Sequence, residues 1–125
     1  MPQPPQPSVQ IFGYDRDAGT RAAVRFFKER RFVIHQVDVT RKPIARGELR
    51  RFTDRLGARA VLDVAGRAYQ DAGLAYMRLD DAEIIERLLS TPGLLRLPLV
   101  RFGNEVAAGR DEAAWRRWLK PAGGA

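Results

Sequence analysis

A strand–helix–strand succession near the start of the chain limits the fold more than any other feature. Residues 9–14 (VQIFGY) and 32–39 (FVIHQVDV) are short, apolar and rich in β-branched or aromatic side chains, which is typical of strands. Between them, residues 18–30 repeat apolar side chains at helical spacing. Two strands joined by one helix pair in parallel through a right-handed crossover. The sequence therefore predicts an α/β fold. The basic residues on the outer face of this helix are Arg21, Arg25 and Lys28.

Helical patterns fill the middle of the chain. Residues 46–57 carry apolar side chains on one face, whereas residues 58–79 are less periodic and predict only short helical turns. Residues 80–93 predict a clear helix, because Asp80 and Glu83 have the spacing of a capping box. Its predicted buried face is Ile84, Ile85, Leu88 and Leu89. The outer face of the 46–57 helix carries Arg50, Arg51 and Arg55.

The last part of the chain returns to strands. Residues 97–102 and 105–109 are strand-like, and the dipeptide Gly103-Asn104 between them predicts a two-residue hairpin turn. Asp111 is predicted to cap a final helix at 112–120. The predicted buried face of that helix is Ala114, Trp115, Trp118 and Leu119.

The order of these elements predicts one domain with a mixed sheet. The succession β-α-β, helices, β-β-α is that of a thioredoxin-like fold with a helical subdomain inserted at about 44–93. We expect the single domain to span 8–120, with disordered tails at 1–7, which is proline-rich, and at 121–125. No signal peptide is visible, and no apolar run approaches the roughly 18 residues of a membrane span, so the prediction is a soluble cytoplasmic protein.

Composition removes several kinds of chemistry. The chain has no cysteine, which excludes disulfides, thiolate metal sites and thiol catalysis by its own residues. The only histidine, His35, is predicted to be a half-buried sheet residue, and one histidine with scattered carboxylates does not form a zinc site. The three tyrosines are predicted to pack in the core or at its edge. We therefore expect no metal and no cofactor.

The charge of the chain favours an acidic partner. Lysine and arginine number 22 and aspartate and glutamate 15, which gives a net charge of +7. The basic residues are spread along the chain without a run of five, so nucleic-acid binding is an open alternative but not a specific prediction.

Three stretches of the sequence resemble the ArsC/Spx family of glutaredoxin-like arsenate reductases and Spx-type regulators. They are GYDRDAGTRAAVRFF (13–27), VLDVAGRAYQDAGL (61–74) and LLRLPLVRFGNEVAAGRDEAAW (94–115). They occur in the family's order and at its spacing, and the resemblance extends over about 8–119. It implies the same thioredoxin-like fold that the element order predicts.

The resemblance also implies that the family's chemistry is missing. Family enzymes hold a cysteine thiolate at the N-terminus of the first helix, where the helix dipole lowers the thiol pKa and binds an oxyanion. Aligning Arg21 with a family basic residue places Asp17 at the cysteine position, whereas aligning Gly19-Thr20 places Ala18 there. We prefer the first register, because it keeps the apolar face of the helix aligned. The second cysteine of Spx-type members falls at Thr20.

Two arginines that position the oxyanion in the family also have no match. Their positions fall at Ala65 and Leu97, next to which the chain has Arg67 and Arg96. A family proline corresponds to Pro98, so the resemblance implies a cis Leu97–Pro98 bond.

The loop before the first helix forms a predicted vestigial site without a catalytic residue. Asp17 is expected to cap the helix by accepting a hydrogen bond from the N–H of Gly19 or Thr20, and its charge would repel an oxyanion. A carboxylate nucleophile or base at Asp17, aided by Asp15, is the alternative. The predicted vestigial-site or ligand-loop residues are Tyr14, Asp15, Asp17, Thr20, Arg21, Arg96, Leu97 and Pro98.

These observations predict a redox-inactive protein that acts by binding. Spx-type relatives bind the C-terminal domain of the RNA polymerase α subunit, so the resemblance implies a transcription-associated protein partner. The candidate binding residues are Arg25, Lys28, Arg50, Arg51 and Arg55. The alternative is a divergent arsenate reductase or glutathione-dependent oxidoreductase in which external glutathione supplies the thiol.

Overall fold

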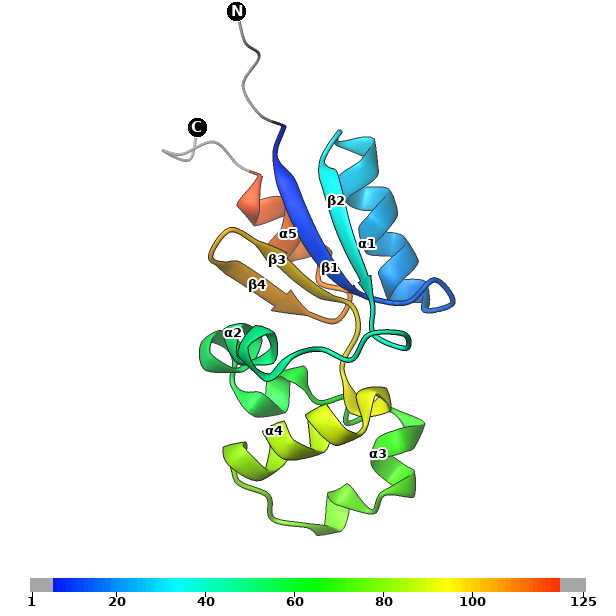
Figure 1. The fold of residues 1–125 in the computed structure, drawn as a ribbon, viewed down its shortest axis with the longest axis vertical. Helices are drawn as coiled ribbons and strands as arrows, with labels where there is room; N and C mark the ends of the chain where they lie inside the picture. Colours follow the sequence, from blue (N-terminus) through cyan, green and yellow to red (C-terminus); the bar gives the residue numbers. More distant parts are fainter. Residues whose placement is uncertain (1–5, 120–125) are drawn as a thin grey trace, which may run out of the picture.

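A four-stranded mixed sheet forms the centre of the computed structural model, which describes residues 6–119 (Figure 1). The strands are β1 (Ser8–Gly13), β2 (Val33–Asp38), β3 (Leu99–Phe102) and β4 (Glu105–Ala108), in the spatial order β2-β1-β3-β4. β1 pairs in parallel with β2 and antiparallel with β3, and β3 pairs antiparallel with β4. The predicted α/β fold with a parallel pair and a C-terminal hairpin is confirmed.

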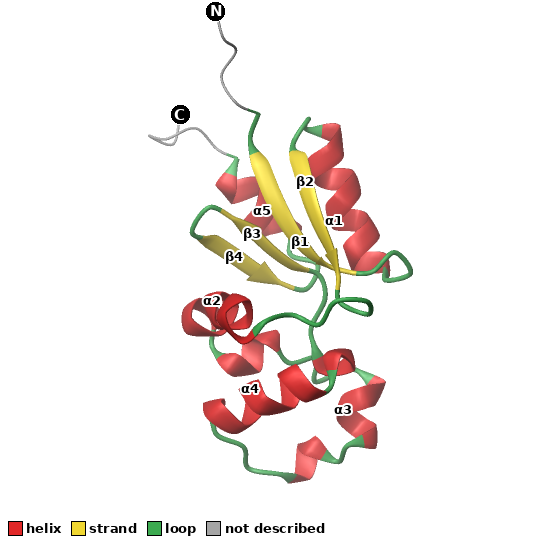
Figure 2. Ribbon diagram, viewed as in Figure 1, coloured by secondary structure: helices red, strands yellow, loops and turns green. Residues whose placement is uncertain are grey.

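Two helices cover one face of the sheet (Figure 2). They are α1 (Ala18–Glu29) and α5 (Glu112–Trp118). Alternation along β1 directs Val9 and Ile11 to this face, where they pack with Phe27 of α1 and Trp115 of α5. Asp111 accepts a hydrogen bond from the N–H of Ala114 at 3.1 Å, so the predicted cap of the last helix is confirmed.

The segment between β2 and β3 is helical and packs beside the end of the sheet where β1 and β2 finish (Figure 1). Phe12 of β1 and Leu99 of β3 join the cluster of Leu49, Ile84 and Leu88 there. The helices are α2 (Arg46–Leu56), α3 (Arg67–Asp71) and α4 (Asp81–Ser90), with 3₁₀ turns η1 (Ala58–Val61), η2 (Leu74–Tyr76) and η3 (Pro92–Leu94). On the face of the sheet opposite α1 and α5, the part farther from this cluster is covered by no helix of residues 6–119 (Figure 2).

Most predicted elements agree with the structure to within two residues at each end. The capping box of Asp80 and Glu83 is confirmed. The strand predicted at 97–102 begins only at Leu99, because Pro98 has no N–H to donate to a strand ladder. The Leu97–Pro98 bond before it is cis, as predicted. In α4, Ile85 and Leu89 are half-buried, whereas Ile84 and Leu88 are buried as expected.

The two predicted tails lie largely outside the described residues, as does Lys120 at the predicted end of the last helix. Pro7, within the predicted N-terminal tail, accepts a hydrogen bond from the N–H of Val33 at 2.9 Å. Across 6–119, no helix has the length and apolar character needed to cross a membrane.

Candidate functional site

The loop between β1 and α1 is organised by one carboxylate. Asp17 has extended backbone angles (φ −78°, ψ 123°) and stands directly before the first residue of α1. Its Oδ2 accepts hydrogen bonds from the backbone N–H of Thr20 at 2.8 Å and from the Thr20 hydroxyl at 2.7 Å. The predicted N-cap is therefore confirmed, with Thr20 and not Gly19 as the donor. The same oxygen also satisfies the hydroxyl of Thr20, which is fully buried.

Two glycines allow this loop to pack closely. A Cβ on Gly13 would lie 2.1 Å from the Thr20 hydroxyl oxygen, so the buried threonine fits only above a glycine. A Cβ on Gly19 would lie 2.9 Å from Cδ of Pro98 and 3.2 Å from the Leu97 carbonyl oxygen. The first turn of α1 therefore packs closely against the loop that contains the cis Leu97–Pro98 bond.

A cleft of about 540 Å³ opens beside Asp17. Tyr14 and Asp17 contribute from the loop, and Asp63, Arg96 and Arg110 come from later segments of the chain. The lining thus holds two carboxylates and two guanidinium groups. This balance of charge differs from an oxyanion pocket, in which cations and N–H donors face the ligand without opposing carboxylates.

The two arginines of the cleft are held by different contacts. The Arg96 side chain lies over Gly109, where its Nε would be 2.6 Å from an added Cβ, and the backbone N–H of Gly109 donates to the Arg96 carbonyl oxygen at 3.1 Å. Arg110 is 3.5 Å from a carboxylate oxygen of Glu112. Arg67 pairs with Asp71 on α3 and does not line the cleft.

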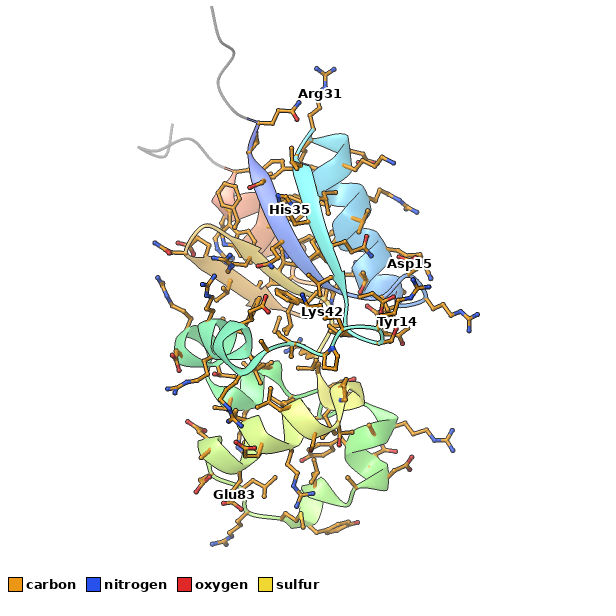
Figure 3. The ribbon with its side chains drawn as sticks, in the orientation of Figure 1. Tyr14, Asp15, Arg31, His35, Lys42 and Glu83 are labelled. Carbon is orange, nitrogen blue, oxygen red and sulfur yellow. The ribbon has the colours of Figure 1, made fainter. Side chains whose placement is uncertain are left out.

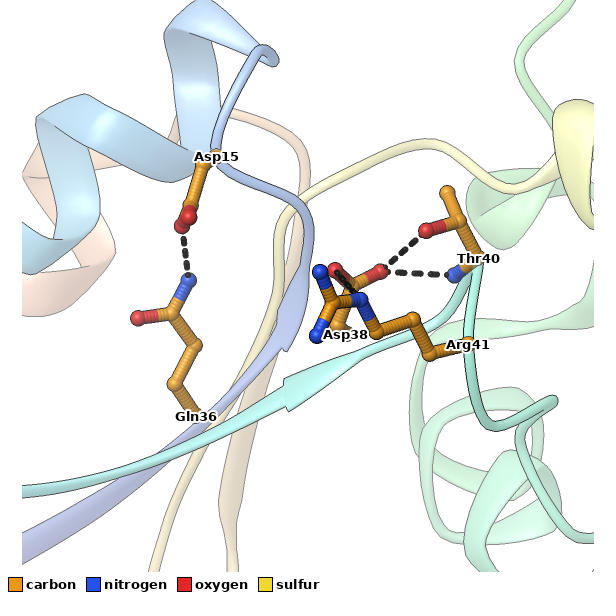
Figure 4. Close-up of polar contacts among 5 residues, drawn as sticks. All are labelled: Asp15, Gln36, Asp38, Thr40 and Arg41. Atoms are coloured by element: carbon orange, nitrogen blue, oxygen red, sulfur yellow. Dashed lines mark hydrogen bonds and ion pairs between the residues drawn. The ribbon is translucent and has the colours of Figure 1, made fainter.

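The turn after β2 completes one wall of the cleft through Thr40. Asp38 accepts hydrogen bonds from the hydroxyl and the backbone N–H of Thr40 and lies 3.8 Å from Nε of Arg41 (Figure 4). The hydroxyl bond of Thr40 is the largest cause that lowers the pKa of the Asp38 carboxyl below its usual value. Nearby, Gln36 donates to Asp15 at 3.0 Å, which ties the β1–α1 loop to β2.

The side chain of Arg21, on α1, is hydrogen-bonded to the backbone of the β1–α1 loop. Its Nη1 donates to the carbonyl oxygens of Asp15 at 3.1 Å and Arg16 at 3.0 Å. Arg25 and Lys28 of α1 are exposed, as are Arg50, Arg51 and Arg55 of α2. The structure therefore keeps two separate basic helix faces as candidate binding surfaces.

Two burial predictions, those for His35 and Tyr76, are wrong. His35 is exposed, because β2 is an edge strand and none of the described helices covers this part of its face (Figure 3). Tyr76 is 95% exposed at the outer end of the helical segment, whereas Tyr14 and Tyr69 are half-buried. Among the residues that the structure describes, no group of three potential ligands is placed to hold a metal ion.

Sequence reasoning missed two polar side chains of the cleft, those of Asp63 and Thr40. Asp63 is brought to the cleft because its N–H donates to the carbonyl oxygen of Leu94 at 2.8 Å, next to a bridge between Leu62 and Leu95. That pairing joins segments about thirty residues apart, and local periodicity carries no signal for it. The sequence Asp38-Val-Thr40 did offer a signal, because an aspartate two residues before a threonine favours a local side-chain turn.

Comparison with known proteins shows similarity to one family and to named arsenate reductases. Residues 13–118 match the model of the ArsC family. The arsenate reductases of Neisseria meningitidis serogroups A and B are each 29% identical over 107 residues, which cover 83% of this chain and 92% of the relative.

Solved structures share the fold at lower identity. The YFFB protein matches with a TM-score of 0.82 and 23% identity, over 90% of this chain and 99% of that chain. Arsenate reductase from Vibrio cholerae matches with a TM-score of 0.79 and 19% identity, over 90% and 98%. At these identities the likeness establishes the thioredoxin-like fold alone.

Proposed function

The chain belongs to the ArsC family, and we propose that it is a redox-inactive member that acts by binding a protein partner. Thiol chemistry by its own residues is excluded, because the sequence has no cysteine. Any function of this chain must therefore come from the family's fold without the family's thiolate.

The contact between Asp17 and Thr20 carries the proposal. The N-terminus of α1 offers free N–H groups and the positive end of the helix dipole, which would otherwise favour a bound anion. Here the Asp17 carboxylate accepts hydrogen bonds from the backbone N–H and the hydroxyl of Thr20. The helix terminus is thus occupied by a charge of the protein itself, and a second anion at this position would be repelled.

A glutathione-dependent arsenate reductase is the competing function, and the cleft argues against it. Arg96 and Arg110 could attract an oxyanion, but Asp17 and Asp63 line the same cleft and oppose the charge of that ligand. External glutathione would supply a thiol without supplying the missing anion site. The mixed charges of the cleft lining therefore favour the interpretation that the loop at Asp17 no longer binds and reduces arsenate.

The proposed partner is the C-terminal domain of the RNA polymerase α subunit, with a role associated with transcription. The support for this partner is the resemblance to Spx-type regulators, together with the net charge of +7, which favours association with an acidic surface.

Binding to a purified C-terminal domain of the α subunit tests the proposal. We expect the immobilised domain to capture the wild-type chain, and charge reversal of the basic residues on one helix, α1 or α2, to weaken capture by about tenfold through lost ion pairing. The α1 variant changes Arg25 and Lys28, and the α2 variant changes Arg51 and Arg55, so both remove the same charge. Failure of the wild-type chain to bind would contradict this partner.

A further inference from the structure

We propose that the groove between α2 and the β3–β4 hairpin is the docking site for an acidic segment of a protein partner. The inference rests on the proposed function, because it assigns the surface through which binding occurs. The groove has a volume of about 420 Å³. Its lining includes three arginines, Arg51, Arg55 and Arg101, one carboxylate, Asp54, and the turn at Gly103-Asn104.

Arg101 is held in position by two uncharged hydrogen-bond acceptors. Its Nε donates to Oε1 of Gln10 at 3.2 Å, and its Nη1 donates to the carbonyl oxygen of Gly103 at 3.3 Å. Gln10 stands directly opposite Arg101 in the β1–β3 pairing, so the register fixes this contact. Both acceptors are uncharged. The guanidinium group is therefore ordered before a ligand arrives, which lowers the entropy cost of binding, yet it keeps its positive charge.

The arginines of α2 bring two further charges to the same groove. Arg51 and Arg55 are four residues apart and lie on one face of α2. The only carboxylate in the lining, Asp54, pairs with Arg50 at 3.6 Å. Within residues 6–119, no recorded ion pair involves Arg51, Arg55 or Arg101. Like charges at this spacing repel one another, and an anionic occupant would relieve that repulsion.

The other basic helix face borders a smaller hollow. Arg25 of α1 lines a hollow of about 160 Å³ together with three further arginines and the carboxylates of Glu29 and Glu112. One of these carboxylates, Glu112, pairs with Arg110 inside the hollow, whereas the carboxylate of the α2 groove, Asp54, pairs with Arg50, which does not line the groove. The groove at α2 is also larger, so the structure favours α2 over α1 as the docking surface.

The surroundings of the groove favour a peptide over a nucleic acid. A nucleic-acid backbone carries a continuous row of charges and requires basic side chains along an extended path. In the sheet beside this groove, Arg101 lies between two uncharged residues, Val106 of β4 and Gln10 of β1. His35 of β2 is the next residue in this row across the strands. A segment with a few carboxylates among uncharged residues matches this pattern, because Arg–carboxylate pairs are short and directional.

A labelled oligoglutamate peptide titrated into the full chain tests the assignment by fluorescence anisotropy. The groove variant Arg51→Glu/Arg55→Glu is compared with the control Arg25→Glu/Lys28→Glu, and each changes the formal charge by four units. We expect the groove variant to weaken binding by about tenfold or more, and the control by about threefold or less, because Arg51 and Arg55 line the larger groove and have no recorded ion pair in the described part of the chain. Equal weakening in both variants, or weakening in the control alone, would overturn the assignment.

Two further measurements keep the test independent of folding and of the general proposal. Circular dichroism must show both variants folded, and backbone amide shifts of the wild-type chain are expected to move at Gly103 and Asn104 on peptide addition, without mutation. A single-stranded oligonucleotide of equal charge that competes more tightly for this groove would overturn the acidic-peptide assignment. Peptide binding at α1 would defeat only this inference, whereas failure to bind the α-subunit domain would defeat the proposed partner itself.

Discussion

Replacement of Asp17 by alanine is expected to lower the free energy of unfolding by about 2 kcal/mol. Loss of an N-cap side chain costs about 1 kcal/mol. The hydroxyl of Thr20 is fully buried and bonds only to Asp17 among the contacts of residues 6–119, so it would lose its partner, which costs about a further 1 kcal/mol or more. Urea denaturation of the wild-type chain and of Asp17→Ala measures the difference.

Two variants separate the cap from a general effect of charge. Asp17→Asn keeps an acceptor oxygen and is expected to lose less than half as much stability as Asp17→Ala. Asp15→Ala removes a carboxylate two residues away, whose contact with Gln36 is exposed, and is expected to be nearly neutral. If Asp17→Ala were as stable as Asp15→Ala, the carboxylate would not be the organising group of the loop.

Replacement of Trp115 by alanine is expected to have the largest effect on stability, about 3–5 kcal/mol. The side chain is fully buried between the sheet and α1, with ring centroids 5.4 Å from Phe26 and 5.8 Å from Phe27. Its removal would leave a cavity at the point where α5 and α1 meet. Thermal and urea denaturation would show a large fall in the midpoint.

A matched change on the same helix provides the control. Trp118 is only half-buried, where it stacks on Phe102, so Trp118→Ala is expected to cost far less. Trp115→Phe is also expected to cost much less than Trp115→Ala, because the ring Nε1 of Trp115 is buried without a hydrogen-bond partner in the described part of the chain. Similar losses for Trp115→Ala and Trp118→Ala would contradict the packing described here.

The sequence carries strong information on the fold because its hydrophobic periods are regular. The strand and helix patterns around Ile11, Phe27 and Trp115 each matched the period of the element that formed, and all three side chains are buried. The exposure of His35 could not be read in this way. Its β-branched neighbours predict a half-buried strand residue, but burial also depends on whether a helix covers that face of the sheet, which only the assembled fold decides.

The site was predictable where its contacts are local. The cap by Asp17 spans three residues, and the helix-start pattern indicated it directly. The cleft is different, because Asp63, Arg96 and Arg110 converge only when the helical segment folds back against the sheet. Arg101 was missed for a related reason: a charged residue in a strand gives no indication of the element beside it, and the groove depends on the packing of α2 against the hairpin.

Formation of arsenite from arsenate tests most directly the claim that the loop at Asp17 no longer performs the family's chemistry. The purified wild-type chain is supplied with arsenate, glutathione and glutaredoxin, with a cysteine-containing arsenate reductase as the positive control. The account predicts a rate equal to the background without the chain, because the chain has no thiol and Asp17 occupies the N-terminus of α1. A rate above background that falls in the Asp17→Ala variant would contradict it.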